Sequence, residues 1–374
     1  MSPFRFAFVL EQTLGHVTHA QNLRSAVTRR PEIEATWIPI GFELGGLGRM
    51  IPGFRDNWSI RASYLARSRL TRELAQRRFD AIFFHTQVTS LFSTAIMREV
   101  PSVVSLDATP LNYDTVGAAY GHRPQRDSWL DRRKHRMNRD AFAAARALVS
   151  WSEWAAASLV AQYGVPRERI TVVAPGASST YFEIGAERPS RARSDGPLRL
   201  LFVGGDFVRK GGHELLDAAT AARTSRRFEV HVVTRAAVPE VPGVVVHRNV
   251  GPNTPELFDL FRSADAFVLP SHGECLSIAL MEAAASGLPT IATDVGALGE
   301  AAIDRRTALV VAAGDLRALR IAIETMVHDD ALRARLGRQA HMLARAKFDA
   351  DRNNDSLMDL LAAVARQTGT RRVA

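Results

Sequence analysis

The feature that most limits the fold of this chain is a regular alternation of short apolar runs with helical patterns. Twelve runs of three to seven residues have the length and the β-branched or aromatic composition of buried strands. They are Phe4–Leu10, Thr36–Ile40, Ala81–Phe84, Ser102–Leu106, Ala147–Ser150, Ile170–Val173, Leu198–Val203, Phe228–Val233, Val244–Val246, Ala266–Leu269, Thr290–Ala292 and Ala308–Val311. Strands that are apolar on both faces and alternate with helices form parallel sheets, so the pattern predicts an α/β fold.

The length of 374 residues favours two domains over one core. We expect an N-terminal Rossmann-like domain (1–182), a linker (183–197) rich in Arg, Ser, Gly and Pro, and a C-terminal Rossmann-like domain (198–348). Residues 349–374 are expected to form a helix and tail, packing outside the second sheet or back on the N-terminal domain. Doubly wound sheets bind ligands at the carboxyl ends of their strands, so the expected site is a cleft that both domains face.

Cysteine content and hydropathy indicate where the protein works. The single Cys275 excludes an internal disulfide and a cysteine-rich zinc site, and it suits a reducing compartment. The opening residues have the pattern of a first strand rather than a signal peptide, and no apolar run approaches the roughly 18 residues of a membrane span. We therefore expect a cytoplasmic protein, with a peripheral position on the inner face of the cell membrane as an option.

The formal charge of +9 is concentrated in two segments. Residues 61–78 hold six arginines against one glutamate, and residues 121–139 hold seven Lys or Arg against two aspartates. Two interpretations stay open: solvated arginine-rich helix faces, or basic amphipathic helices that meet an anionic membrane surface or an acidic acceptor. Nucleic acid is not expected, because no helix-turn-helix, finger or RNP pattern accompanies the charge.

The stretch Leu198–Ala219 has the features of an anion site. A strand ends at Val203, Gly204 and Gly205 permit close backbone approach, and Arg209 and Lys210 precede a helix start. Helix N–H groups and two cations suit a phosphate, although the spacing is not that of a P-loop. The alternative is a basic loop that binds nothing.

The stretch Ser271–Pro289 places Glu274 at the mouth of an alanine-rich helix and Glu282 inside it. We expect the helix to run from near Leu276 to Gly287, with Glu282 about 9 Å along the axis, roughly the length of a diphosphate. Carboxylates accept hydrogen bonds from hydroxyls, so a nucleotide sugar could give one end to each. The alternative is a Glu274 that complements the helix dipole and an exposed Glu282.

These motifs resemble the signature of family four of the retaining GT-B glycosyltransferases. The resemblance is carried by Leu198–Gly212, Ser271–Pro289, "TDVGALGE" at 293–300 and Val149–Ser178, and it covers most of the chain, strongly from Ala147 to Val311. It implies the GT-B fold and a nucleotide-diphosphate sugar as donor. It also implies that Arg209 and Lys210 hold the diphosphate and stabilise the leaving group.

The resemblance assigns further roles. Glu282 would bind the ribose, Glu274 would hold the transferred sugar, and Glu300 would support the site. The remaining donor contacts would come from Gly15, Gly204, Gly205, Cys275, Leu276 and Ser277. The family usually has Phe-Gly where this chain has Leu276-Ser277, which leaves the sugar preference open.

The N-terminal domain would carry the acceptor side. Asp107 ends a strand where the family often reads His-Asp, but Leu106 replaces the histidine, so that role falls to His16 or His122. We take His16 and Asp107 as catalytic candidates beside Arg209, Lys210 and Glu274. His16 and His19 lack an identifiable third ligand, so no metal and no cofactor other than the donor is expected.

The resulting hypothesis is a metal-independent hexosyltransferase that moves a sugar to an acceptor hydroxyl with retention, in cell-envelope glycan or glycolipid synthesis. The acceptor would be a glycan, a lipid-linked precursor or a small molecule. Two alternatives remain: a GT-B-type sugar-nucleotide epimerase, which would need no acceptor, and an inactive carbohydrate- or partner-binding protein on the same scaffold.

Overall fold

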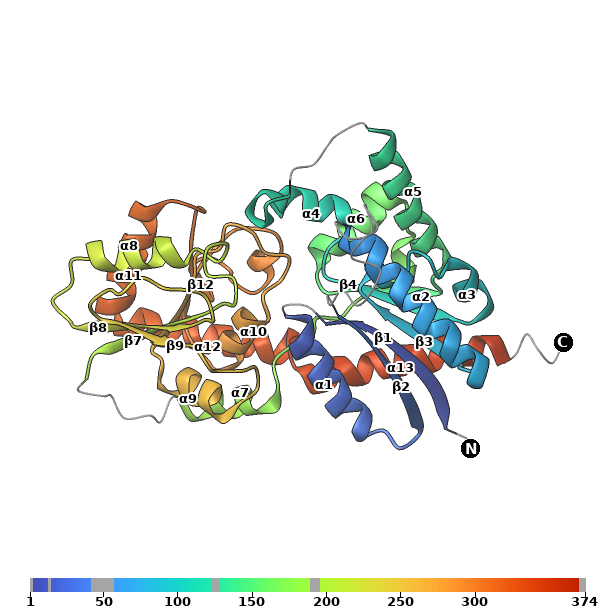
Figure 1. Cartoon of the computed structure of the whole chain (residues 1–374). Helices are drawn as coiled ribbons and strands as arrows, with labels where there is room; N and C mark the ends of the chain where they lie inside the picture. The colour runs from blue at the N-terminus through green and yellow to red at the C-terminus, as the bar shows by residue number, and fades with distance from the viewer. Residues whose placement is uncertain (1–2, 13–14, 42–56, 123–127, 189–195, 370–374) are drawn as a thin grey trace. The chain divides into compact units, whose positions relative to one another are not determined.

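The computed structural model describes residues 3–12, 15–41, 57–122, 128–188 and 196–369, which form two compact units (Figure 1). The first unit comprises Met1–Leu111, Pro124–Ala174 and Arg352–Ala374, and the second comprises Asn112–Arg123 and Pro175–Asp351. The chain therefore passes from one unit to the other four times. Each unit is described by itself.

The first unit is built on a six-stranded parallel sheet in the order β2-β1-β3-β4-β5-β6. Its elements are β1 (Phe4–Glu11), α1 (His16–Thr28), β2 (Ile33–Ile40), α2 (Trp58–Gln76), β3 (Ala81–His85), η2 (Gln87–Thr89), α3 (Thr94–Glu99), β4 (Ser102–Leu106), α5 (Trp129–Ala144), β5 (Ala147–Ser150), α6 (Glu153–Tyr163), η4 (Arg167–Arg169), β6 (Ile170–Val172) and α13 (Ala350–Gly369). Helix α4 (Pro110–Val116) leads out of it, and η3 (Gly117–Tyr120) follows in the second unit.

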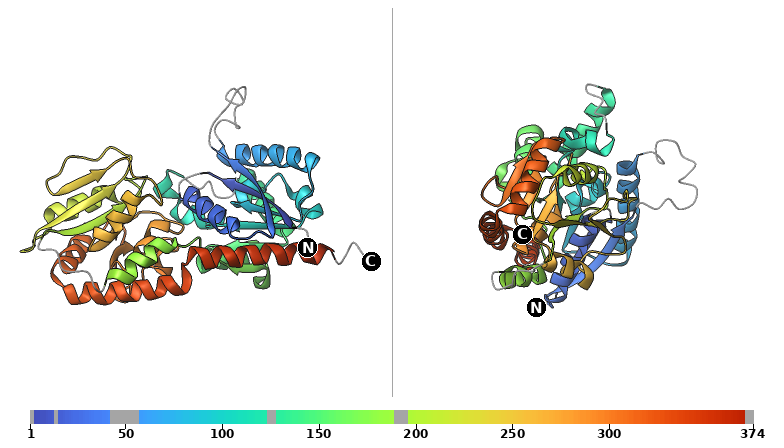
Figure 2. Two further views of the ribbon diagram at one scale, coloured as in Figure 1. Left: turned by 90° about the horizontal axis from the view of Figure 1, so that it is seen from below. Right: turned by 90° about the vertical axis from the view of Figure 1, so that its left-hand side faces the viewer.

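Apolar cores cover both faces of this sheet. On one face, Ala62, Ala66 and Leu70 of α2 recur every four residues and so share one side of the helix, which packs with α3, α5 and α6. On the other face, α1 and the C-terminal helix α13 cover the phenylalanines of β1 and β3, and Figure 2 shows α13 running along the strands. Of the two placements expected for the C-terminal helix, the structure has the one on the N-terminal sheet.

The second unit has a six-stranded parallel sheet in the order β12-β11-β10-β7-β8-β9. Its elements are α7 (Ser179–Glu187), β7 (Leu198–Val203), α8 (Gly212–Ala221), β8 (Phe228–Val233), β9 (Val244–His247), α9 (Pro255–Ser263), β10 (Ala266–Leu269), α10 (Ile278–Ala285), β11 (Thr290–Thr293), η6 (Leu298–Glu300), β12 (Ala308–Val311), α11 (Leu316–His328) and α12 (Asp330–Lys347). Helix α8 packs with α11, and α10 packs with α7 and α12.

All twelve expected strands are present, and the α/β class with two doubly wound parallel sheets is confirmed. The largest difference is at β2, which begins at Ile33 rather than Thr36 because Ile33 to Ala35 pair with Phe4 to Phe6. Residues 183–187 of the expected linker are helical, since Tyr181 and Ile184 bury one side of α7. Residues 189–195 of that linker lie outside the described residues.

No helix in the described part of the chain is long and apolar enough to cross a membrane.

Candidate active site

The second sheet has a topological switch point between β7 and β10. Strands β8 and β9 extend from β7 in one direction, while β11 and β12 extend from β10 in the other. Ligands of such sheets bind outside the carboxyl ends of the strands at this point. Gly204 and Gly205 directly follow β7, and Ser271 to Glu274 follow β10, so both predicted motifs meet at the expected place.

The β7–α8 loop is shaped by three glycines. A β-carbon on Gly204 would lie 2.4 Å from Cδ of Lys210, so the lysine stem passes directly over this residue. Gly211 has φ +74°, and its β-carbon would lie 2.1 Å from the carbonyl oxygen of Pro270. Gly212, the first residue of α8, packs under the Phe207 ring in the same way. The loop therefore holds Lys210 against the segment after β10, as only glycine allows such close contacts.

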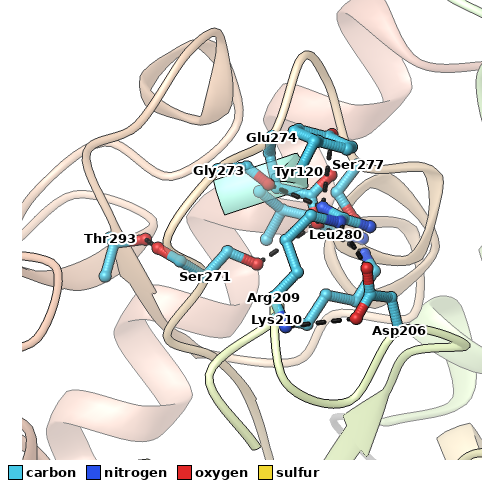
Figure 3. A network of polar contacts seen from close by, with 10 residues as sticks. All are labelled: Tyr120, Asp206, Arg209, Lys210, Ser271, Gly273, Glu274, Ser277, Leu280 and Thr293. Carbon is cyan, nitrogen blue, oxygen red and sulfur yellow. Dashed lines mark hydrogen bonds and ion pairs between the residues drawn. The ribbon is translucent and has the colours of Figure 1, made fainter. Parts of the chain in front are cut away.

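Glu274 is the centre of a buried ion network (Figure 3). Its Oε1 accepts from Nζ of Lys210 at 2.6 Å and from Oγ of Ser271 at 3.2 Å, and Nη1 of Arg209 lies 3.2 Å away. Burial alone would raise the pKa of this carboxyl, but Lys210 and Arg209 outweigh it and the pKa is lowered. Glu274 is thus an anion, and its Oε2 has no hydrogen-bond partner among the described residues.

Arg209 is held from several directions and is only 5% exposed. Its Nε donates to Oδ2 of Asp206 at 3.0 Å, and its Nη1 donates to the Gly273 carbonyl at 2.6 Å and to the Tyr120 hydroxyl at 3.2 Å. Burial opposes the charge, yet Glu274, Tyr120 and Asp206 keep the pKa of the guanidinium above its ordinary value. The group is a fixed cation at the end of the sheet.

Glu282 lies inside α10 and is buried, so the alternative of an exposed Glu282 is wrong. Burial raises its pKa to about 7, and Tyr181 and Lys210 oppose that rise in part. The Tyr181 hydroxyl faces the carboxyl without a hydrogen bond of regular geometry. Near neutral pH, Glu282 therefore exchanges a proton readily.

The segment between Glu274 and Glu282 is held by a helix cap and by a backbone hydrogen bond. Ser277 caps α10 by accepting from the N–H of Leu280 at 3.4 Å, and Cys275 and Leu276 are buried beside it. The helix begins at Ile278, two residues later than expected. Ala297 N donates to the Cys275 carbonyl at 2.9 Å.

The turn after β11 packs on the same segment. Gly296 has φ +57°, and a β-carbon there would lie 1.7 Å from the Glu274 carbonyl oxygen. Glycine at 296 is thus required for the turn that leads to Glu300 to approach Glu274. Glu300 is half-buried in η6 at the end of that turn.

The first unit has its own group of polar residues at a switch point, where β1 and β3 adjoin. Gly15 precedes α1, His16 begins it, and Nδ1 of His16 lies 2.8 Å from Nε2 of the buried His85. Nε2 of His16 lies 3.9 Å from Oδ2 of Asp107, which follows β4. The predicted pair His16 and Asp107 is therefore brought together within this unit.

Burial dominates the protonation of this group. It raises the pKa of Asp107, with Glu11 adding to the rise and His16 opposing it. It lowers the pKa of His85 well below the ordinary value and that of His19 to about 3, with His16 adding to both. His85 stacks on the Trp151 ring at 5.2 Å. The neutral His85 ring thus packs against His16 and fixes its orientation.

In the part of the chain that the structure describes, no group of three or more His, Cys, Asp or Glu is arranged to hold a metal ion. His16 and His19 both contact His85 and Trp151 through their rings instead. His122, the other histidine considered, lies in the second unit and pairs with Asp114 at 2.8 Å.

Sequence reasoning missed four contributors: Asp206, Tyr120, His85 and Tyr181. Asp206 and His85 carried a usable signal, because each is a polar residue within three positions of a strand's carboxyl end. Tyr120 lies 89 positions from Arg209, and Tyr181 lies in α7 at the edge of the expected linker, so no local pattern points to either.

Comparison with known families finds two sequence matches. Residues 197–329 match the family described as "Glycosyl transferases group 1", and residues 24–180 match "Glycosyltransferase Family 4". Among curated proteins, the chain is 29% identical over 299 residues to a D-inositol 3-phosphate glycosyltransferase of Arthrobacter sp. (strain FB24), covering 74% of this chain and 69% of that one. It is 27% identical over 234 residues to a glycogen synthase of Mycobacterium tuberculosis, covering 59% of this chain and 55% of the relative.

Solved structures share the fold at low identity. Sucrose-phosphate synthase from Thermosynechococcus elongatus aligns with a TM-score of 0.74 at 16% identity, covering 98% of this chain and 100% of that one. Anabaena Alr3699/HepE, solved in complex with UDP and glucose, aligns with a TM-score of 0.67 at 14% identity, covering 96% of this chain and 100% of that one.

Proposed function

Because the chain belongs to the group 1, family 4 glycosyltransferases of the GT-B fold, we propose that it transfers a sugar from a nucleotide-diphosphate sugar to an acceptor hydroxyl with retention of configuration. The family and the enzyme class expected from the sequence are confirmed. The donor, the stereochemistry and the acceptor are the proposal. Because Alr3699/HepE was solved with UDP and glucose, UDP-glucose is the first donor to test.

The observation that carries this proposal is that the two carboxylate oxygens of Glu274 have different surroundings. One carboxylate oxygen is occupied by Lys210, Arg209 and Ser271, while the other has no partner among the described residues. A fixed, negatively charged carboxylate oxygen can accept a hydrogen bond from a sugar hydroxyl. The two cations beside it suit the negative charge that develops on a departing diphosphate.

Bond cleavage would follow from this arrangement. The bond between the anomeric carbon and the diphosphate oxygen breaks, and the electron pair leaves with the phosphate. Lys210, Arg209 and the N-terminus of α8 stabilise that charge, so in this proposal the leaving group needs no metal ion. We propose that the acceptor hydroxyl attacks the oxocarbenium-like centre from the face that the diphosphate leaves, and that its proton passes to the leaving phosphate.

Glu282 is assigned to the ribose of the nucleotide. Its buried carboxyl, with a pKa of about 7, becomes a better acceptor for the ribose hydroxyls once it loses its proton. Gly204, Gly205, Cys275, Leu276 and Ser277 are proposed as the backbone around the donor, and Glu300 as support for it.

His16 and Asp107 are proposed to serve the acceptor side of the reaction, and Gly15, which precedes His16, to contact the donor. His85 fixes Nδ1 of His16 and leaves Nε2 directed toward Asp107. His16 and Asp107 could thus hold an acceptor hydroxyl or a sugar hydroxyl by a shared hydrogen bond.

The acceptor is proposed to belong to cell-envelope glycan or glycolipid synthesis at an anionic membrane surface. Residues 61–76 of the first basic segment lie in α2 and residues 129–139 of the second lie in α5, while residues 123–127 are outside the described part of the chain. On α5, Trp129 is 61% exposed and Leu130 is 54% exposed, next to the exposed Arg132, Arg133 and Lys134. Apolar tips beside cations are typical of helices that rest on anionic bilayers. Sedimentation with phosphatidylglycerol vesicles, compared with phosphatidylcholine vesicles, tests this placement.

The experiment that tests the reaction is a thermal-shift screen with UDP- and GDP-sugars, followed by product analysis. We expect one nucleotide sugar to stabilise the protein and to be hydrolysed slowly without acceptor, releasing the nucleoside diphosphate. An altered sugar still attached to its nucleotide would favour the epimerase instead. No stabilisation by any nucleotide sugar would contradict the proposal.

A further inference from the structure

We propose that Tyr120 is a positioning residue that fixes the guanidinium of Arg209 so that one amino group, Nη2, faces the diphosphate of the donor. This inference rests on the proposed function of Arg209. It adds a residue from the N-terminal half of the sequence to an anion site that is otherwise built after β7 and β10.

Tyr120 contacts Arg209 in two ways at once. The guanidinium carbon lies 4.4 Å from the centre of the Tyr120 ring, and Nη1 donates to the Tyr120 hydroxyl at 3.2 Å. A cation over an aromatic face is attracted to it, the more so where water is excluded. With Arg209 only 5% exposed, this contact contributes to the orientation of the cation.

The other contacts of Arg209 define which part of the guanidinium remains available. Nε is used by Asp206, and Nη1 is used by Gly273, Tyr120 and Glu274. Within the described residues, Nη2 has no partner (Figure 3). The guanidinium group is planar, so contacts that fix Nε and Nη1 also fix the direction in which Nη2 points. An arginine side chain loses rotamer entropy when it is fixed, and here that ordering precedes ligand binding.

The position of Tyr120 is itself braced. Gly273 has Ala119 packed on it so closely that a β-carbon would lie 2.7 Å from the Ala119 methyl group. The Tyr113 ring lies 5.0 Å from the Tyr120 ring, and η3 ends at Tyr120 with Gly121, which has φ +71°, as its C-cap. This segment belongs to the second unit by its contacts, although both flanking segments of the chain belong to the first.

The test is a double-mutant cycle on diphosphate affinity. UDP, GDP and inorganic pyrophosphate are titrated against the wild type, Tyr120→Leu, Arg209→Gln and the double variant, with thermal melting to confirm folding. We expect Tyr120→Leu to weaken binding about tenfold in the wild-type background and to have no further effect once Arg209 is Gln.

Two further variants separate positioning from packing. Tyr120→Phe keeps the ring and should bind within about threefold of the wild type, because the cation–ring contact survives. Tyr64→Leu, at an exposed tyrosine of α2 in the first unit, is the control and should also stay within about threefold.

The outcomes distinguish this inference from the proposed function. In one outcome, the wild type binds a diphosphate and Arg209→Gln does not. If Tyr120→Leu then has no effect, or if the effects of the two substitutions on affinity are additive, only the role of Tyr120 is overturned. If the wild type binds neither nucleotide nor pyrophosphate, both this inference and the proposed function are overturned.

Discussion

Lys210 lies over Gly204 at a distance that no other residue at 204 would permit, since a β-carbon there would be 2.4 Å from Lys210 Cδ. The nearest obstacle is a flexible side chain, so an added methyl group displaces the lysine rather than the backbone. The neighbouring Gly205 has nothing within 4 Å of an added β-carbon. These two adjacent glycines therefore provide a matched pair of substitutions.

We expect Gly204→Ala to weaken nucleotide-sugar binding by about tenfold or more, because Lys210 leaves Glu274. Gly205→Ala should lose less affinity than Gly204→Ala, because it leaves Lys210 in contact with Glu274. Isothermal titration of both variants with UDP-glucose measures this difference. Equal affinities for the two variants would show that the lysine position does not matter.

Removal of the Lys210 charge should slow sugar transfer strongly. Lys210→Met keeps most of the side-chain volume but removes the cation beside the leaving group, and we expect kcat to fall by about 100-fold to 1,000-fold. Lys347→Met, at an exposed position at the end of α12, is the control and should keep full activity. Rates are measured as release of the nucleoside diphosphate, and a fall below threefold at Lys210 would contradict the assigned role.

Glu282 should make the protein less stable as pH rises. Its folded pKa of about 7 lies above the ordinary 4.5, so the unfolded chain releases this proton first and stability is lost as pH rises toward 7. The difference corresponds to about 3 kcal/mol, which Glu282→Gln should recover at pH 8 but not at pH 4.

The same Glu282→Gln substitution should weaken nucleotide binding at pH 8, because an amide accepts fewer hydrogen bonds from the ribose than a carboxylate does. Thermal melting and UDP titration thus move in opposite directions. If the stability of Glu282→Gln relative to the wild type is the same at pH 4 and at pH 8, the raised pKa of the buried Glu282 is refuted.

His19 should make the protein sensitive to acid. Its folded pKa of about 3 lies below the ordinary 6.5, so stability is lost as pH falls from 6.5 toward 3. Neither ring nitrogen has a hydrogen-bond partner among the described residues. We expect His19→Leu to reduce the loss between pH 7 and pH 5 by about 2 kcal/mol.

The control for His19 is His328→Leu, at an exposed position at the end of α11. Urea midpoints at pH 5 and pH 7 for the three proteins measure the effect. Parallel pH dependence in the wild type and His19→Leu would show that His19 is not the acid-sensitive group.

The fold was largely predictable from sequence because each strand carries its own signal. Buried parallel strands are apolar on both faces, so runs such as Leu198–Val203 and Ala266–Leu269 need no partner to be recognised. The same holds for Arg209, Lys210 and Glu274, which follow such strands directly. Adjacent parallel strands bring their carboxyl ends together, so the motifs meet without further information.

What escaped prediction depends on contacts between distant parts of the chain. The pKa of Glu282 follows from its burial within α10, and its neighbour Tyr181 comes from α7, whose last five residues fall in the expected linker. The placement of α13 was open because an amphipathic helix does not specify which sheet it covers. In the structure, α13 buries the aromatic residues on one face of β1 and β3.

The fourfold passage of the chain between its units has a consequence for chimeric enzymes. An exchange of halves at residue 182 would leave the first sheet without the helix that covers Phe6, Phe8 and Phe83. It would also give the second sheet a foreign residue in place of the ring under Arg209. Hybrids with relatives should therefore exchange two segments together, residues 112–123 and 175–351, if the recipient is to keep both cores intact.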